Sequence, residues 1–420
     1  MNTTFESLGL SEPLLRALNE ENYTHPTPIQ TRAIPALLAG RDLLGIAQTG
    51  TGKTAAFGLP LLQRLSENRT RPEPKGTRAL ILAPTRELAV QIDQSLKTYG
   101  RHLGLRQAVI LGGVSQNAQV NAMRGGVDIL VATPGRLLDL VKQNHIRLDR
   151  AQVLIVDEAD RMLDMGFIKD VRRIVGMLPK DRQSMLFSAT MPGEVVQLIG
   201  DMLRQPERVE VSPPTVTADR IEQRVIHIAQ KDKRTLLSHL LRDDAFKRVI
   251  VFTRTKHIAN RVSEHLEKQG FATDAIHGNK SQNARQRALD GFKSGQVRVL
   301  VATDIAARGV DVDNITHVIN FELPNEPESY VHRIGRTARA GSEGIAISFC
   351  DPAERSQLRD IERLVKRQLP VVEHGLAPDA LAAAGSVNEM PRSFGHKKPP
   401  ENSYKRPKRR FQPRGSRRAA

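Results

Sequence analysis

The sequence is almost without cysteine, since Cys350 is the single thiol in 420 residues. One thiol excludes an internal disulfide and is typical of proteins kept in a reducing compartment. A lone cysteine can act as a nucleophile, but Cys350 ends the apolar run Ile345–Phe349. We therefore expect a buried structural thiol.

The sequence also lacks long apolar runs and a basic leader. No apolar stretch approaches the ~18–20 residues that a membrane-spanning helix needs. The opening residues, MNTTFESLGL, contain no basic stretch followed by an apolar one, as a signal peptide would. We expect a cytoplasmic protein with no membrane partner.

Acidic residues are too few to balance the basic ones, 46 against 63, which gives a formal net charge of +17. From Arg392 to the end, eleven Lys and Arg face one acid, Glu401. Apolar periodicity fades from about Val371, so residues 371–420 are predicted to form a disordered basic tail. Such an excess indicates a polyanionic partner, nucleic acid before acidic membrane.

Before the tail, apolar runs alternate with helix-compatible stretches in two series. The runs are continuous, which predicts buried parallel strands in two doubly wound α/β domains, residues 1–206 and 220–370. Residues 207–219, with Pro213 and Pro214, have the composition of a linker. The predicted strands are Leu43–Ile46, Ala79–Ala83, Ala108–Leu111, Ile129–Ala132, Val153–Val156, Met185–Phe187, Val249–Phe252, Val299–Ala302, His317–Phe321 and Ile345–Phe349.

A glycine-rich loop follows the first of these runs and leads into a helical stretch. Its residues are Ala47, Gln48, Thr49, Gly50, Thr51, Gly52, Lys53 and Thr54. This is the phosphate-binding P-loop spacing if Ala47 replaces the usual first glycine. Glycines let backbone N–H groups converge on an anion, Lys53 can reach the β- and γ-phosphates, and Thr54 can bind Mg²⁺. The alternative is a strand–helix turn that binds nothing.

Asp157 and Glu158 directly follow the predicted strand Val153–Val156. A carboxylate at the end of a buried strand beside a P-loop strand is where Mg²⁺ is held, so we assign the metal to Asp157 and Thr54. Glu158 would then activate the attacking water. The acids can also cap the following helix, and the two roles are compatible.

Two arginines, Arg336 and Arg339, are three residues apart and share a face if the segment is helical. Guanidinium groups supplied by a second domain suit a transferring phosphate and would act as arginine fingers. The alternative is a basic solvated face. Gln30, after two prolines, has a carboxamide that matches the edge of adenine, although taken alone it reads as an ordinary surface glutamine.

Taken together, the motifs resemble those of the DEAD-box RNA helicases over roughly residues 5–368. In order, they are Gln30 with its Pro-Thr-Pro-Ile lead-in, AQTGTGKT, PTREL, GG, TPGR, DEAD, SAT, ATDIAARGVD and HRIGRTAR. The tail and the wording HRIGRTAR and ARAGSEG are most similar to the bacterial RhlE-type branch. Asn22 and Ala338 stand where the family often has glycine.

The resemblance implies two RecA-like domains that bind ATP, with a Q motif over residues 3–31. It implies that Tyr23 stacks on adenine, Gln30 reads its edge, Asp311 touches the ribose, and Arg336 and Arg339 meet the γ-phosphate. The residues implied to couple nucleotide and RNA are Asp160, Ser188, Thr190 and His332. The residues implied to contact RNA are Pro84, Thr85, Arg86, Gly113, Thr133, Gly135, Arg136, Thr253, Arg254, Gln282, Arg285 and Thr303.

The expected function is RNA-stimulated ATP hydrolysis that locally unwinds short duplexes, largely independently of sequence. An RNA clamp or annealing chaperone that works mainly through the tail is an alternative, and a DNA translocase is a third. The bacterial resemblance suggests ribosome assembly, RNA turnover or cold adaptation. Precursor ribosomal particles or RNA-degradation machinery are therefore candidate partners.

Overall fold

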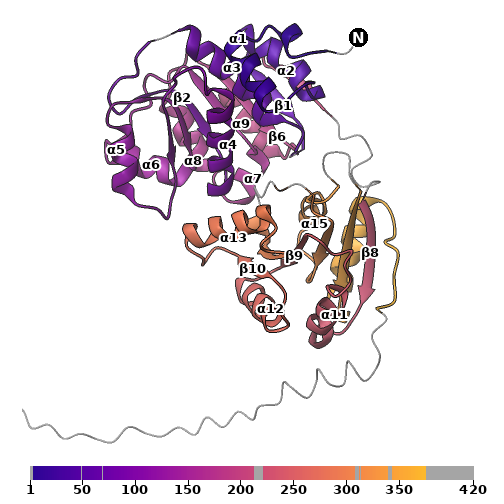
Figure 1. Ribbon diagram of the computed structural model, residues 1–420. Helices are drawn as coiled ribbons and strands as arrows, with labels where there is room; N and C mark the ends of the chain where they lie inside the picture. Colours follow the sequence, from indigo (N-terminus) through magenta and orange to yellow (C-terminus); the bar gives the residue numbers. More distant parts are fainter. Residues whose placement is uncertain are drawn as a thin grey trace, which may run out of the picture. The chain divides into compact units, whose positions relative to one another are not determined.

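We describe a computed structural model of the chain, which covers residues 3–48, 50–68, 70–211, 221–307, 312, 314–338 and 343–374. In this part of the chain there are two parallel β-sheets, each flanked by helices (Figure 1). We call residues 3–211 the first lobe and residues 221–374 the second lobe. The predicted tandem of doubly wound α/β domains is confirmed.

The first lobe contains a parallel sheet in the order β3-β4-β2-β5-β6-β1-β7. All strands predicted for this lobe are present. The strands are β1 Leu43–Ile46, β2 Thr77–Leu82, β3 Gln107–Ile110, β4 Val127–Ala132, β5 Val153–Val156, β6 Gln183–Ser188 and β7 Glu207–Glu210.

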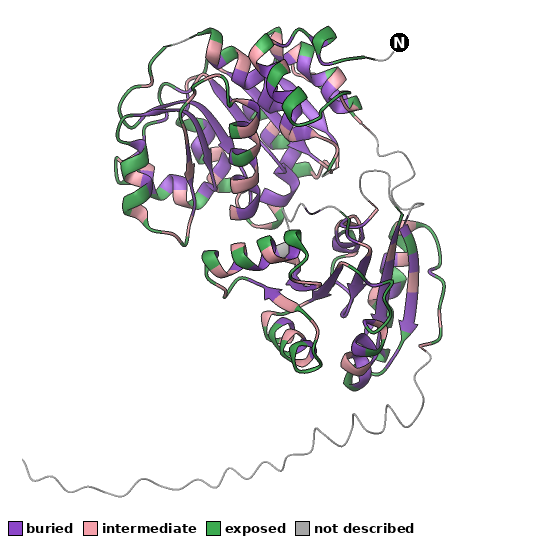
Figure 2. Cartoon of the chain, in the orientation of Figure 1, coloured by how far each residue is buried: buried purple, intermediate pink, exposed green. Residues whose placement is uncertain are grey.

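Helices cover both faces of this sheet, because alternate strand residues point to opposite sides. Ile81 and Ile155 belong to a core with α1–α4, whereas Leu80 and Leu154 belong to a core with α5–α9. In Figure 2 the strands are buried and the outer helix faces are exposed. The helices are α1 Glu12–Glu20, α2 Pro28–Leu38, α3 Lys53–Glu67, α4 Arg86–Tyr99, α5 Gln116–Met123, α6 Pro134–Lys142, α7 Ala159–Asp164, α8 Ile168–Gly176 and α9 Gly193–Met202.

The second lobe has a parallel sheet in the order β10-β11-β9-β12-β13-β8. The strands are β8 Ile221–His227, β9 Val249–Thr253, β10 Thr273–Ile276, β11 Val299–Thr303, β12 His317–Asn320 and β13 Gly344–Cys350. The helices are α11 Lys233–Leu240, α12 Lys256–Lys268, α13 Gln282–Ser294, α14 Asp304–Ala307, α15 Pro327–Ile334 and α16 Arg355–Val365. The second lobe also contains the 3₁₀ turns η2 Gln230–Asp232 and η3 Pro352–Glu354, and the first lobe contains η1 Glu6–Leu8.

The predicted linker begins too early. Residues Glu207–Glu210 form β7 and pair in parallel with β1. Their sequence, ERVE, has no apolar run because this edge strand buries only Val209. Residues 212–219 of the predicted linker lie outside the described residues.

The chain returns to the second sheet after α16. Val225 donates its N–H to Pro370 O at 2.8 Å, and Val372 donates to Val225 O at 2.8 Å. Residues 370–372 therefore cover part of the outer edge of β8. Residues 375–420, most of the predicted tail, are not among the described residues.

The thiol of Cys350 and the length of the apolar helices were also predicted from the sequence. Cys350 is 1% exposed, and burial raises the pKa of its thiol to about 11, so the buried structural thiol is confirmed. Across the residues that the structure describes, helices long and apolar enough to cross a membrane are lacking.

Candidate nucleotide and nucleic-acid site

The glycine-rich loop lies between β1 and α3, as predicted. Gly50 and Gly52 have φ angles of 85° and 92°, which glycine adopts without a steric penalty. Lys53 begins α3, and its Nζ donates to Ala47 O across the loop at 2.9 Å. Thr51 donates its hydroxyl to Gln48 O at 2.8 Å. The loop backbone and Lys53 thus lie together at the N-terminus of a helix, a place where phosphate groups commonly bind. The predicted Thr49 is outside the described residues.

Gln30 is not an ordinary surface glutamine, because its side chain joins α2 to the P-loop. Its Oε1 accepts from Thr27 N at 2.8 Å, and its Nε2 donates to Gly52 O at 3.1 Å. Gln30 is only 2% exposed, and a Cβ on Gly52 would lie 2.5 Å from its Nε2. The Gln30 carboxamide is therefore bonded directly to the loop that would hold phosphates. Tyr23 is 41% exposed and packs edge-on against Tyr99 at 6.1 Å.

The two acids after β5 are almost completely buried. Asp157 is 2% exposed, and burial raises the pKa of its carboxyl to about 6, with Lys53 opposing and Glu158 adding to the rise. Asp157 Oδ1 is buried without a hydrogen-bond partner in the described chain. An orphaned carboxylate oxygen facing a lysine suits a cation ligand. Glu158 has a φ of 56°, an unusual left-handed backbone for this residue type.

Asp160 connects the DEAD segment to the SAT segment. Its Oδ2 accepts from Ala189 N at 3.1 Å, from Thr190 N at 2.9 Å and from Thr190 Oγ1 at 3.1 Å. Ser188 Oγ accepts from Asp160 N at 3.2 Å and donates to Thr190 O at 2.7 Å. The structure thus brings together three of the four predicted coupling residues. The fourth, His332, lies on α15 of the second lobe.

The first-lobe residues predicted to contact RNA gather at the carboxyl ends of β2, β3 and β4. Thr85 caps α4 by accepting from Leu88 N at 3.2 Å, and Pro84 precedes it. Arg86 lies against Gly113, where a Cβ would approach Arg86 Nη1 to 2.2 Å. Gly113 also has a φ of 72°, a left-handed backbone that favours glycine.

The remaining first-lobe residues predicted to contact RNA lie at the start of helix α6. Thr133 is the N-cap residue of α6, and Gly135 and Arg136 lie in the first turn of that helix. Arg136 Nη1 donates to Val114 O at 3.4 Å. Backbone N–H groups at a helix start and nearby guanidiniums are suited to a phosphate backbone.

In the second lobe, three of the residues predicted to contact RNA also lie at the carboxyl ends of strands. Thr253 and Thr303 end β9 and β11, and Arg254 follows β9. Arg254 Nη2 pairs with Glu322 Oε1 at 3.2 Å and with Glu354 Oε1 at 3.3 Å. These carboxylates hold the guanidinium in one orientation.

Gln282 and Arg285, one turn apart on α13, both contact Glu87. Gln282 Nε2 donates to Glu87 Oε1 at 3.2 Å, and Arg285 Nη2 pairs with Glu87 Oε2 at 2.9 Å. Glu87 lies in the PTREL motif, from which the sequence predicted no role for it. The signal for this role was an acidic residue inside a segment expected to contact RNA, where it can hold Arg285 and Gln282.

Arg336, the first of the two predicted arginines, does not lie in a helix. Helix α15 ends at Ile334, and Gly335 caps it, so Arg336 lies in the turn beyond. Arg336 is 4% exposed and donates from Nε to His332 O at 3.3 Å. Arg339 and Asp311 lie outside the described residues, so the geometry of these two predicted contacts is not described.

Arg333, in the same motif, is a structural residue. It is 1% exposed, pairs with Asp304 through Nη2 at 2.7 Å, and donates to Asn320 Oδ1 at 3.1 Å. Its guanidinium also lies over the Phe252 ring at 5.1 Å. All three guanidinium nitrogens of Arg333 donate hydrogen bonds within the second lobe.

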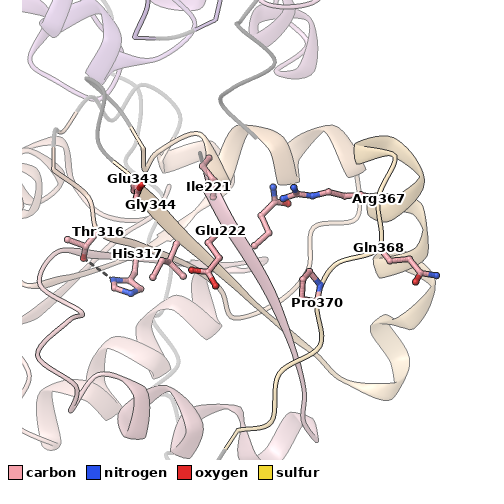
Figure 3. A pocket seen from close by; sticks show the side chains of 11 residues that line it. Ile221, Glu222, Thr316, His317, Glu343, Gly344, Arg367, Gln368 and Pro370 are labelled. Atoms are coloured by element: carbon pink, nitrogen blue, oxygen red, sulfur yellow. Dashed lines mark hydrogen bonds between the residues drawn. The ribbon is translucent and has the colours of Figure 1, made fainter. Parts of the chain in front are cut away.

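A hollow of about 680 Å³ lies elsewhere, at the amino-terminal ends of β8, β12 and β13 (Figure 3). Figure 3 shows Thr316 and His317 on one side, and Arg367, Gln368 and Pro370 on the other. None of the predicted site residues that the structure describes lines this hollow. It is not part of the candidate site.

The family profile "DEAD/DEAH box helicase" matches residues 27–199, and "Helicase conserved C-terminal domain" matches residues 232–341. DEAD-box ATP-dependent RNA helicase CshA of Bacillus subtilis is 42% identical over 387 residues, covering 92% of this chain and 77% of that protein. ATP-dependent RNA helicase CshA of Listeria monocytogenes is 41% identical and covers 90% and 72%, respectively.

Two solved structures resemble the chain over nearly its whole length. S. cerevisiae Dbp5 bound to RNA and ADP BeF3 has a TM-score of 0.79 and 31% identity, covering 92% of this chain and all of that one (100%). Mss116 bound to ssRNA and UDP-BeF has a TM-score of 0.82 and 26% identity, covering 93% and 84%, respectively.

Proposed function

Because this chain belongs to the DEAD-box ATP-dependent RNA helicases, we propose a residue-level account of how it couples ATP hydrolysis to RNA remodelling. The enzyme is an RNA-stimulated ATPase with two RecA-like domains. The observation that carries the proposal is the convergence of the P-loop, the orphaned oxygen of Asp157 and the Asp160 network at one edge of the first sheet.

ATP binds through the residues from Ala47 to Thr54. The N–H groups of the loop and the start of α3 surround the phosphates, and Lys53 moves from Ala47 O to the β- and γ-phosphates. Tyr23 stacks on adenine and Gln30 reads its edge. Asp311 contacts the ribose.

Thr54 and Asp157 are the residues that fit Mg²⁺. Across the described residues, His, Cys, Asp and Glu do not form a cluster of three that could hold a metal alone. Magnesium sites in nucleotide enzymes need few protein ligands, because phosphates and water complete the shell. When bound, Mg²⁺ supplies neutralisation of phosphate charge. A cation there would satisfy the orphaned Asp157 oxygen.

Glu158 is the residue that takes the proton of the attacking water. It follows Asp157 immediately, and its carboxylate is buried away from bulk solvent. Arg336 and Arg339 approach the γ-phosphate and stabilise the charge that gathers on it.

Short hydrogen-bonded connections couple RNA binding to the nucleotide site. Thr133 and Thr85, which contact RNA in this proposal, are the N-cap residues of α6 and α4, at the same sheet edge as the P-loop. Asp160 joins the DEAD segment to Ser188 and Thr190, so a shift of either segment moves the other. ATP and RNA therefore favour each other's binding by reciprocal coupling.

The test is the variant Glu158→Gln, with the exposed residue variant Glu194→Gln on α9 as control. We expect RNA-stimulated ATP turnover to fall by about 10²–10⁴-fold, the usual worth of a general base, while ATP-dependent RNA binding persists. Strand separation in a fluorescent duplex assay should fall in parallel. Undiminished remodelling would instead favour the clamp or annealing chaperone, which the basic tail supports.

We further propose a cytoplasmic enzyme of the RhlE-type branch that acts on structured RNA in ribosome assembly, RNA turnover or cold adaptation. The net charge of +17 and the basic tail support a broad RNA partner. Crosslinking of the protein to its RNAs in cells would test this. Enrichment of precursor ribosomal RNA would favour assembly, and enrichment of messenger RNA would favour turnover.

A further inference from the structure

Arg161, the residue directly after the DEAD segment, is buried against Glu158. Arg161 Nη1 pairs with Glu158 Oε2 at 2.7 Å, and the two side chains are each 4% exposed. The residues stand at i and i+3, so α7 brings them to one face. None of the roles assigned above uses this arginine.

The contact is held on both sides by the local backbone. Glu158 is the N-cap residue of α7, with a left-handed φ of 56°. Arg161 N donates to Asp160 Oδ1 at 3.0 Å, while the other oxygen of that carboxylate binds Ala189 N and Thr190 N. The helix that carries Arg161 is therefore fixed to the SAT segment.

A buried arginine is a poor choice if only packing is needed. Burying a guanidinium and a carboxylate loses hydration, and an apolar pair of similar volume is often at least as stable. A 2.7 Å charge-assisted hydrogen bond does, however, fix the direction of a carboxylate. Direction matters for a general base, which must lie within hydrogen-bond reach of its water.

We propose that Arg161 is a positioning residue for Glu158, which orients the carboxylate toward the attacking water. The inference rests on the proposed role of Glu158 as the base. Without the guanidinium, the buried carboxylate loses its charged partner and turns to other donors. Since Arg161 is anchored through Asp160 to Ser188 and Thr190, the SAT segment also controls where Glu158 points.

The first experiment compares Arg161→Met with Arg173→Met. Arg173 makes an i,i+3 pair with Asp170 on α8 but is 63% exposed, so it controls for loss of an arginine from a helix. We expect Arg161→Met to lower kcat for RNA-stimulated ATP hydrolysis by about 10–100-fold, the scale of a misplaced catalytic group. KM for ATP, ADP affinity and RNA affinity should change less than about twofold, since binding groups are untouched. Arg173→Met should leave all four unchanged.

A second comparison separates positioning from a merely structural role. In a Glu158→Gln background, Arg161→Met should cause no further loss of kcat, because the arginine acts only through Glu158. In the nucleotide-free and metal-free protein, Arg161→Met should lower Tm, and the double variant should recover most of it. Additive losses of kcat, or equal losses of kcat and ADP affinity, would overturn the proposal.

Failure of this inference can be told from failure of the proposed function. If Glu158→Gln retains normal turnover, the assignment of the base is wrong. If Glu158→Gln is inactive and Arg161→Met keeps normal kcat, only the role of Arg161 is wrong. Where Arg161→Met does not fold, Arg161→Lys takes its place. Its shorter reach predicts a lowered kcat at unchanged KM, and an unchanged kcat refutes the proposal.

Discussion

Two non-glycine residues, Asn22 and Ala338, occupy positions where the DEAD-box motifs often carry glycine. Both have a positive φ, 59° and 56°. Left-handed backbone is strained for residues with a Cβ, although asparagine tolerates it better than alanine. The family's preference at these positions thus reflects backbone conformation, and Ala338 bears the larger strain.

Ala338→Gly should stabilise the second lobe by roughly 0.5–1 kcal/mol. The substitution relieves the strain of the left-handed backbone, and the greater conformational entropy of glycine in the unfolded chain offsets part of that gain. Its control is Ala346→Gly, a fully buried position inside β13, which should destabilise by about 1 kcal/mol. Urea unfolding followed by circular dichroism would measure both. The same sign for the two variants would contradict the argument.

His317 gives the second lobe a predictable sensitivity to acid. The side chain is 4% exposed and stacks on Phe246 with ring centroids 3.9 Å apart. Burial lowers the pKa of His317 to about 4, with Arg224 lowering it further and Asp243 opposing. The unfolded chain binds a proton below about pH 6.5, whereas the folded chain does so only near pH 4.

The contribution of neutral His317 to the free energy of unfolding should therefore be complete above about pH 6.5. It should fall by up to about 3 kcal/mol as the pH drops toward 4. The variant His317→Asn should lose this part of the acid dependence, while the exposed control His239→Asn should keep it. Thermal unfolding at half-unit pH intervals would measure the difference. Parallel curves for the wild type and His317→Asn would refute the assignment.

At the scale of elements, a buried ion network joins α11, η3 and the ends of β9 and β12. Lys233 is fully buried, pairs with Glu354 and lies 3.2 Å from Asp351 Oδ2. Glu354 also accepts from Leu323 N at 3.1 Å and pairs with Arg254. Lys233 thus balances two buried carboxylates, and one of them, Glu354, also holds Arg254, for which we propose an RNA contact.

Lys233→Met should destabilise the second lobe by about 3–5 kcal/mol, because buried Asp351 loses its lysine partner and Glu354 keeps only Arg254. Adding Glu354→Gln should recover part of that loss. The matched control is Arg16→Met, whose exposed pair with Glu20 should be worth less than about 1 kcal/mol. Denaturant unfolding would test the series, and equal losses for Lys233→Met and Arg16→Met would exclude a special role for the network.

At the scale of the whole molecule, charge is divided unevenly along the chain. Eleven Lys and Arg from Arg392 onward face one acid. Each phosphate contact by a basic residue releases counterions, which steepens the salt dependence of binding. The tail should therefore strengthen RNA binding without touching the nucleotide site.

Deletion of residues 377–420 should weaken RNA binding at low salt by at least about tenfold and flatten the slope of log K against log salt. The deletion begins after Val372, because that residue donates to Val225 O and covers the edge of β8. ADP affinity should stay unchanged. RNA titrations at several salt concentrations would measure the slope, and identical slopes for the two proteins would exclude a role for the tail.

The strands of both lobes could be predicted from the sequence except for β7, β8 and β10. All three are edge strands of their sheets. An edge strand packs against one neighbour only, so it needs no continuous apolar run, and its pairing depends on residues far away in the chain. The end of α15 before Arg336 escaped prediction for a related reason, since a helix end is set by local capping that a motif does not encode.

The sequence by itself determined the chemistry: the P-loop, the paired acids and the order of motifs. These depend on local spacing between a strand and the turn that follows it, and local spacing is written in the chain. Tertiary structure alone decided that Gln30 bonds Gly52, that Asp157 keeps an unpartnered oxygen and that Arg161 holds Glu158. Burial and hydrogen-bond partners are properties of packed neighbours, and no single segment of sequence contains them.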